Sequence, residues 1–206
     1  VDRDLEEFFM RLECEFDNDE RKLAKFKEAF HQQMAANHSM KWQMYDRDKK
    51  PKMAIFVSKY DHCLYDILSR HASGELKVKI PLIISNHKDL EHIAQAFTIP
   101  FVHIPVTKQN KEQAEQRQID LLKEHKIDLI VLARYMQILS ENFVTQFPNR
   151  IINIHHSFLP AFPGAKPYHS AYKRGVKIIG ATSHYVTSDL DEGPIIEQEI
   201  VRVSHV

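Results

Sequence analysis

The sequence has little of what marks secreted, membrane-spanning or nucleic-acid-binding proteins. Its 206 residues include only two cysteines, Cys14 and Cys63, and no CxxC pair, which argues against a disulfide scaffold and fits a reducing cytoplasm. Lysine plus arginine equals aspartate plus glutamate at 28 each, so no net charge favours nucleic acid or an anionic membrane. Apolar runs such as 127–133 are far shorter than the roughly 20 residues that span a bilayer. We therefore expect a cytoplasmic protein with a small-molecule partner.

Residues 1–46 predict a small α+β unit. Segment 8–16 alternates apolar and charged side chains, which is the pattern of a half-buried antiparallel strand. The polar residues 17–19 can cap a following amphipathic helix, and 40–45 predicts a second short strand. The charged stretch 47–52 suits a solvated linker, so we expect the domain boundary there.

Residues 53–206 predict an α/β domain. Short, nearly continuous apolar segments alternate with amphipathic stretches, which is typical of a Rossmann-like, mostly parallel sheet covered by helices on both faces. The expected strands are 53–58, 79–85, 101–106, 128–133, 151–155, 178–186 and 195–203. The expected helices are 63–71, 90–97, 111–125 and 169–174.

Two strings carry groups suited to acyl chemistry. In NIHHSFLP, Asn153 and His155 lie two residues apart on a strand and so point to one face, at the strand end where such sheets bind ligands. In HYVTSDLDEGP, Asp191 adds a carboxylate. An amide and an imidazole can hydrogen-bond an oxyanion, while a carboxylate can hold the imidazole charged or steer an attacking water. The alternative is that Asn153 and His155 merely cap backbone groups.

The strings NIHHSFLPAFPG, GATSHYVTSDLDEGPIIEQ and LARYMQILS resemble the folate-dependent formyltransferase superfamily and, within it, the formyltetrahydrofolate deformylase family. The resemblance covers 53–206 and keeps the order and spacing of the motifs. It implies a formyltransferase-type fold and hydrolysis of 10-formyltetrahydrofolate to tetrahydrofolate and formate, in support of one-carbon and purine metabolism. It also implies no prosthetic group, and a homo-oligomer.

The same resemblance assigns site residues. It implies catalytic roles for Asn153, His155 and Asp191. Met136 and Ile138, taken alone, would more often be core residues, so their assignment depends on the resemblance. The residues implied to contact the folate are Met136, Gln137, Ile138, Leu139, His184, Thr187, Ser188, Asp189, Glu192 and Gly193.

The turn after the first strand of this domain, within 56–64, has no glycine. An enzyme that formylates glycinamide ribonucleotide needs a glycine-rich turn here, because glycine lets backbone N–H groups approach the substrate phosphate. The sequence therefore favours water as the acceptor. A formyltransferase with an amine acceptor, or a catalytically silent folate-binding protein, stays open. Lys59, Asp61 and His62 could form an ordinary helix entry, with Ser58 or Asp61 as cap, or act directly.

The strand–helix–strand order of 1–46 resembles the second half of an ACT domain, the ferredoxin-like regulatory module that precedes the catalytic domain in the deformylase family. The string FFMRLECEF carries this resemblance, which implies a possible small-molecule effector. Because the chain begins with Val1 and nothing follows to cover the predicted strand 195–203, we expect a piece of a longer protein.

Thirteen histidines raise the question of a metal site. His155 and His156 are adjacent on a strand and so point to opposite faces, and no HExxH motif or Cys/His cluster with ligand spacing joins them to His169 and His184. We expect no catalytic metal. We expect His169 to open the helix 169–174 or to line the cleft.

Overall fold

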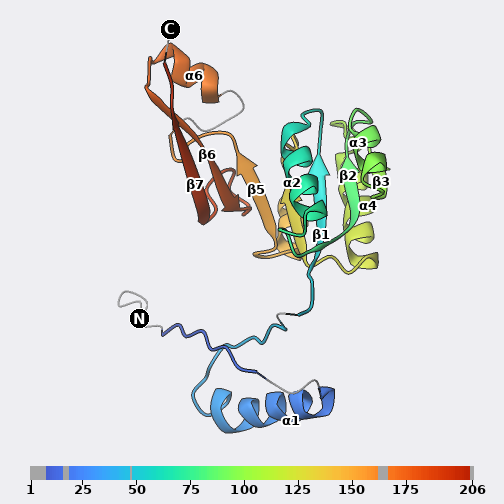
Figure 1. The fold of residues 1–206 in the computed structure, drawn as a ribbon, viewed down its shortest axis with the longest axis vertical. Helices are drawn as coiled ribbons and strands as arrows, with labels where there is room; N and C mark the ends of the chain where they lie inside the picture. Colours follow the sequence, from blue (N-terminus) through green and yellow to red (C-terminus); the bar gives the residue numbers. More distant parts are fainter. Residues whose placement is uncertain (1–7, 16–18, 47, 162–166, 205–206) are drawn as a thin grey trace. The chain divides into compact units, whose positions relative to one another are not determined.

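The computed structural model describes residues 8–15, 19–46, 48–161 and 167–204. The chain divides into two compact units, Val1–Arg47 and Asp48–Val206 (Figure 1). Parts of the predictions lie outside the described residues: position 16 of the first predicted strand, positions 17 and 18 of the predicted cap, and 162–164 of the NIHHSFLPAFPG string.

The first unit contains one part of the predicted pattern, its helix. Helix α1 (Glu20–Phe30) continues into the π-helical turn η1 (His31–Ala35). The carboxylate of Asp19 caps α1 by accepting a hydrogen bond of 2.9 Å from the backbone N–H of Arg21. The ring of Phe30 packs edge-on against Trp42, with 4.9 Å between the ring centroids.

The prediction of two strands in this unit is wrong. Residues 8–15 and 40–45 form no strand, and side chains such as Phe8 and Leu12 are 70% and 71% exposed. An alternating segment becomes a strand only when a neighbour pairs with its backbone N–H and C=O groups, and no described residue does so here. The ACT-like character of this unit stays a prediction.

The second unit is built on a seven-stranded sheet with the strand order β3-β2-β1-β4-β5-β6-β7 (Figure 1). Neighbouring strands from β3 to β5 pair in parallel, whereas β6 runs antiparallel to β5, and β7 antiparallel to β6. The predicted α/β class with a mostly parallel sheet is confirmed. The strands are β1 (Lys52–Val57), β2 (Lys79–Ser85), β3 (Phe101–His103), β4 (Leu129–Leu132), β5 (Ile151–His155), β6 (Ile178–Tyr185) and β7 (Ile195–Arg202).

The helices of this unit include the four that the sequence predicts. The helices that the structure describes in this unit are α2 (His62–Ala72), α3 (Glu91–Ala96), α4 (Lys111–Glu124), α5 (Glu141–Gln146) and α6 (Pro167–Lys173). Helix α5 is not among the helices that the sequence predicts. Ser140 marks its start, since the Ser140 hydroxyl accepts a hydrogen bond of 3.2 Å from the Phe143 N–H.

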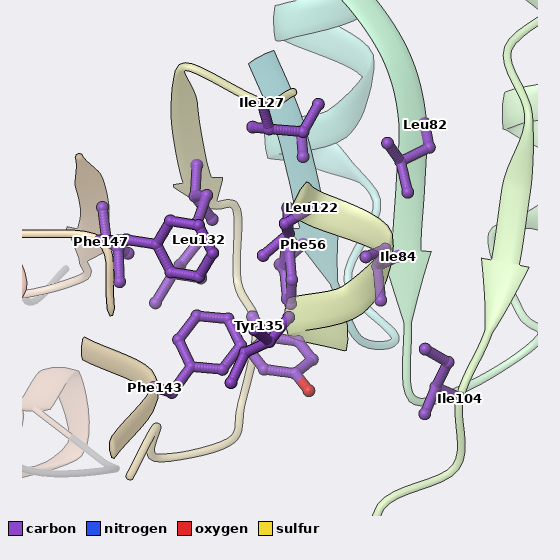
Figure 2. Close-up of a cluster of buried hydrophobic side chains, with 14 of the residues drawn as sticks. Phe56, Leu82, Ile84, Ile104, Leu122, Ile127, Leu132, Tyr135, Phe143 and Phe147 are labelled. Carbon is purple, nitrogen blue, oxygen red and sulfur yellow. The ribbon is translucent and has the colours of Figure 1, made fainter. Parts of the chain in front are cut away.

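Side-chain alternation along β1 separates two core layers. Ala54 and Phe56 face a layer that includes residues of α4 and α5, whereas Met53, Ile55 and Val57 face a layer that includes residues of α2 and α3. Figure 2 shows the first layer, in which the Phe56 ring meets the Tyr135 and Phe143 rings at centroid distances of 5.2 and 6.1 Å. Helices therefore cover both faces of the sheet, which is why β1 reads as an unbroken apolar run.

The strand order reverses beside β1. The chain passes from β1 to β2 and β3 on one side and then returns to the other side of β1 as β4. In open α/β sheets, the crevice at such a reversal, outside the carboxyl ends of the strands, is where ligands bind. The carboxyl ends of β1, β4 and β5 lie next to one another at this edge, which we call the carboxyl edge.

Candidate active site

The pairing of β5 with β6 brings the predicted amide and a histidine together. Asn153 lies directly opposite His184 in the antiparallel register, and the Asn153 Nδ2 atom is 3.2 Å from His184 Nε2. Because an amide NH₂ only donates, His184 Nε2 accepts and its proton sits on Nδ1, which lies 2.9 Å from the Tyr185 carbonyl oxygen. These two bonds fix the orientation of both side chains.

The predicted histidine and carboxylate also meet. The Asp191 Oδ1 atom lies 3.3 Å from His155 Nδ1 and 3.8 Å from His184 Nε2. The side chains of His155, Asp191 and His184 are only 6%, 9% and 2% exposed. Because little water screens them, the Asp191 carboxylate and the His155 imidazole interact more strongly than they would at the surface.

The turn 187–193 carries Asp191 to this place. Asp191 has a left-handed backbone with φ of +60°, a conformation that aspartate adopts more readily than most residues. At Gly193 an added Cβ would lie 1.7 Å from the carbonyl oxygen of Tyr185, the last residue of β6, so only glycine fits where the turn passes this strand end on its way to β7. The Tyr185 N–H then donates to the Pro194 carbonyl at 2.9 Å. Gly193 is therefore needed for the position of the carboxylate.

The chain that follows β5 is held by Thr182, a buried residue opposite His155. Its hydroxyl donates to the Ser157 carbonyl at 2.8 Å and accepts from the Leu159 N–H at 3.1 Å. These bonds fix the path of the backbone directly after His155.

The loop 134–140 leaves β4 at the same edge, because Leu132 pairs with Asn153. Its backbone is anchored by the Met136 N–H, which donates to the Ser58 hydroxyl at 3.0 Å. The Ser58 hydroxyl in turn donates to Asn86 Oδ1 at 2.7 Å, and both side chains are buried. Ser58 and Asn86 were missed as site residues; the available signal was a polar residue at the ends of β1 and β2.

The predicted folate-contacting residues fall into separate groups: His184 contacts the catalytic residues, whereas the others lie in the loop 136–139 and the turn 187–193. Contacts join Asn153, His155, His184 and Asp191 into one cluster. The loop 134–140 lies at the same edge of the sheet by strand register. Met136, Ile138, Ser188, Asp189 and Glu192 are exposed, Gln137 and Thr187 are half-buried, Gly193 is buried, and Leu139 packs against the first core layer.

The helix entry after β1 differs from expectation. Asp61 stands at the first position before α2 but makes no side-chain cap bond, and Ser58 bonds Asn86 and Met136 instead. Lys59 and His62 are exposed. Neither residue caps α2: Asp61 makes no side-chain cap bond, and the Ser58 hydroxyl is engaged by Asn86, which follows β2, and by Met136, in the loop after β4.

Two further groups have environments that change their acidity. Burial raises the pKa of Tyr135 to about 12, although the hydrogen bond from Gln118 Nε2 at 3.0 Å acts in the opposite direction. Burial also raises the pKa of the Cys63 thiol, against the influence of the Arg134 charge.

Within the described parts of the chain, no group of three or more His, Cys, Asp or Glu residues is placed to hold a metal ion. His169 is exposed on α6. In the same parts of the chain, no helix has the length and apolar character needed to cross a membrane.

Comparison with known proteins agrees with this geometry. The formyl transferase family model matches residues 51–206. A formyltetrahydrofolate deformylase of Synechocystis sp. is 57% identical over 198 residues, covering 96% of this chain and 69% of the relative. One of Bacillus subtilis is 48% identical over 198 residues, covering 96% and 66%.

A solved structure is similar as well. The crystal structure of a formyltetrahydrofolate deformylase from Pseudomonas syringae pv. tomato superposes with a TM-score of 0.85 at 49% identity, covering 89% of this chain and 61% of that one. The chain thus spans about two thirds of the length of these relatives. Fold, motifs and identity together show that the chain belongs to the formyl transferase family and, within it, to the formyltetrahydrofolate deformylases.

Proposed function

We propose that this chain hydrolyses 10-formyltetrahydrofolate to tetrahydrofolate and formate. The observation that carries the proposal is the contact of 3.3 Å between His155 Nδ1 and Asp191 Oδ1, beside an amide on the same face of β5. The deformylase names of relatives 48–57% identical to this chain support the same reaction.

Asn153 and protonated His155 would bind the formyl oxygen as it becomes an oxyanion. Loss of one donor from such a site costs on the order of 10²–10³ in rate. The Asp191 carboxylate next to His155 favours the charged ring, and His184 holds the Asn153 amide in place at 3.2 Å. His184 is thus a positioning residue in this scheme.

Asp191 also serves the attacking water. It orients the water and accepts its proton while a C–O bond forms at the formyl carbon. The bond between that carbon and N10 then breaks, N10 takes the proton, and formic acid leaves and releases its remaining proton to water to become formate. No oxidant, reductant or prosthetic group enters this balance, and 10-formyltetrahydrofolate is the substrate rather than a resident cofactor.

The folate is held by the loop 136–139 and the turn 187–193 in this proposal. The exposed apolar side chains of Met136 and Ile138 offer contact area to a flat ring, and the anchored backbone of the loop offers fixed donors and acceptors. Gln137, Thr187 and the exposed polar residues of the turn complete the proposed set.

Transfer to an amine is the alternative reaction. The turn after β1 disfavours it, because Phe56 to Leu64 contains no glycine that would let backbone N–H groups approach a substrate phosphate. Measuring formate release from 10-formyltetrahydrofolate with no amine present decides between the two. The Asn153→Ala variant is the control. Formate from the unchanged protein and far less from the variant supports hydrolysis. Tight folate binding with no formate from either protein would make the chain a binding protein.

The wider assignments go beyond the reaction itself. We propose a cytoplasmic homo-oligomer, with a possible small-molecule effector at the first unit; these assignments follow the family resemblance and stay predictions. The absence of a catalytic metal stays a prediction in the same sense.

A further inference from the structure

Arg134 has an unusual backbone for an arginine. Its φ is +61°, in the left-handed region that costs a residue with a Cβ roughly 1–2 kcal/mol. Thr98, Lys126 and Asn149 share this conformation, but each follows the end of a helix, where a left-handed residue is a common way to finish the last turn. Arg134 instead follows strand β4. Strain of this kind, away from a helix end, points to a functional constraint.

The Arg134 side chain lies across the turn after β1. Its guanidinium carbon is 4.6 Å from the centroid of the Tyr60 ring, which is a cation–π contact. The Arg134 Nε atom is buried and has no hydrogen-bond partner among the described residues. The stacked contact with Tyr60 therefore helps to hold this guanidinium where it lies.

This pair stands at the reversal point of the sheet. Tyr60 follows β1 and Arg134 follows β4, and the crevice between the carboxyl ends of these two strands is the usual ligand site of open α/β sheets. Strand β5, with Asn153 and His155, is the next neighbour of β4. A second substrate that approached the formyl carbon from this crevice would meet the two stacked side chains.

We propose that the Tyr60–Arg134 stack fills the acceptor side of the crevice and thereby determines that water, rather than an amine, takes the formyl group. This inference depends on the proposed function. Both reactions break the bond between the formyl carbon and N10 and return a proton to N10. Hydrolysis forms a C–O bond with water, whereas transfer forms a C–N bond with an amine that gives up a proton. The stack therefore acts on the choice of nucleophile, not on the activation of the formyl group.

The test uses glycinamide, a small primary amine, as the probe. The protein is incubated with 10-formyltetrahydrofolate and glycinamide, and formate and N-formylglycinamide are measured in the same reaction. We expect Arg134→Gly and Tyr60→Ala to raise the ratio of N-formylglycinamide to formate by about tenfold or more, which corresponds to about 1.4 kcal/mol between the two transition states. Glycine suits the left-handed backbone at 134, so the first variant is expected to fold.

Two controls separate the stack from general effects. Tyr60→Phe keeps the aromatic ring and should leave the ratio unchanged. Lys126→Gly places a glycine at another left-handed position, between α4 and β4 at the opposite edge of the sheet, and should also leave it unchanged.

The outcomes are distinct. A ratio that stays constant in both Arg134→Gly and Tyr60→Ala, with folding verified by circular dichroism, overturns the inference while leaving hydrolysis intact. An equal rise in Lys126→Gly overturns it too, because the effect would then not belong to the stack. If the unchanged protein releases no formate, the proposed function fails, and the inference fails with it.

Discussion

Replacing Gly193 with alanine should displace the turn that carries the catalytic carboxylate. An added Cβ would lie 1.7 Å from the carbonyl oxygen and 2.9 Å from the carbonyl carbon of Tyr185, and 3.3 Å from Thr187 Cγ2. The first two contacts are with the backbone of strand β6, which cannot rotate away as a side chain can. The turn 187–193 must therefore move outward by about an ångström or more to reach an ordinary carbon–oxygen contact distance.

The expected effect follows from the position of Asp191 two residues before this glycine. Its carboxylate oxygen is 3.3 Å from His155 Nδ1, and a displacement of about 1 Å takes it out of contact. Misplacement of a catalytic group by this amount costs on the order of 10²-fold in rate. Overpacking at the site should lower the free energy of unfolding by about 1–3 kcal/mol, which leaves most of the protein folded.

The assay is formate release from 10-formyltetrahydrofolate, measured beside thermal unfolding. Gly74→Ala is the matched control, because Gly74 also has a positive φ of +81° but an added Cβ there meets no atom within 4 Å. That variant should lose about 1–2 kcal/mol of stability through backbone strain and keep its activity. Should Gly193→Ala hydrolyse the substrate as fast as the unchanged protein, the reasoning about the turn is refuted.

Three further predictions concern other residues. The pKa of Tyr135 is about 12 in the folded state and about 10 in the unfolded chain, so the free energy of unfolding should fall by up to about 3 kcal/mol between pH 10 and 12. Urea titrations should show a smaller fall for the Tyr135→Phe variant, and an equal fall in both proteins would contradict this. Iodoacetamide at pH 8 should alkylate exposed Cys14 before Cys63, whose thiol pKa is raised by burial; mass spectrometry showing the reverse order would refute it. Ser58→Ala should raise the KM for the folate by about tenfold with a smaller change in kcat, because the Met136 N–H loses its acceptor. Ser58→Thr keeps the hydroxyl and should restore the original KM. A lower kcat at constant KM would argue against anchoring of the loop by Ser58.

The sheet of the second unit could be predicted because both of its faces are buried. Strand β1 is apolar at each residue from Met53 to Val57. A short apolar run of this length, between segments with a helical pattern, is typical of a strand buried on both faces. Asn153 and His155 stand out because they are polar residues at the end of strand β5, where apolar residues precede them.

The first unit shows where this reasoning fails. The alternation in 8–15 describes a side-chain pattern, but strand formation also needs a pairing partner, which an amphipathic segment does not specify. The α1 helix was predictable because a helix satisfies most of its backbone groups within itself and Asp19 supplies the cap.

The rest of the site depends on contacts between segments far apart in the sequence. Ser58 and Asn86 are ordinary polar residues until the sheet places them beside Met136. The contact of Arg134 with Tyr60 likewise requires β1 and β4 to be neighbours, and no local pattern reveals a left-handed arginine.

The central claim is that Asp191, held against His155, drives attack of water on the formyl carbon. Its most direct test compares formate release by Asp191→Asn with that of the unchanged protein, in the absence of any amine, while folate binding is followed by calorimetry. The account predicts that the variant binds the folate nearly as well and releases formate on the order of 10²–10³ times more slowly. Formate release by the variant at close to the original rate would contradict it.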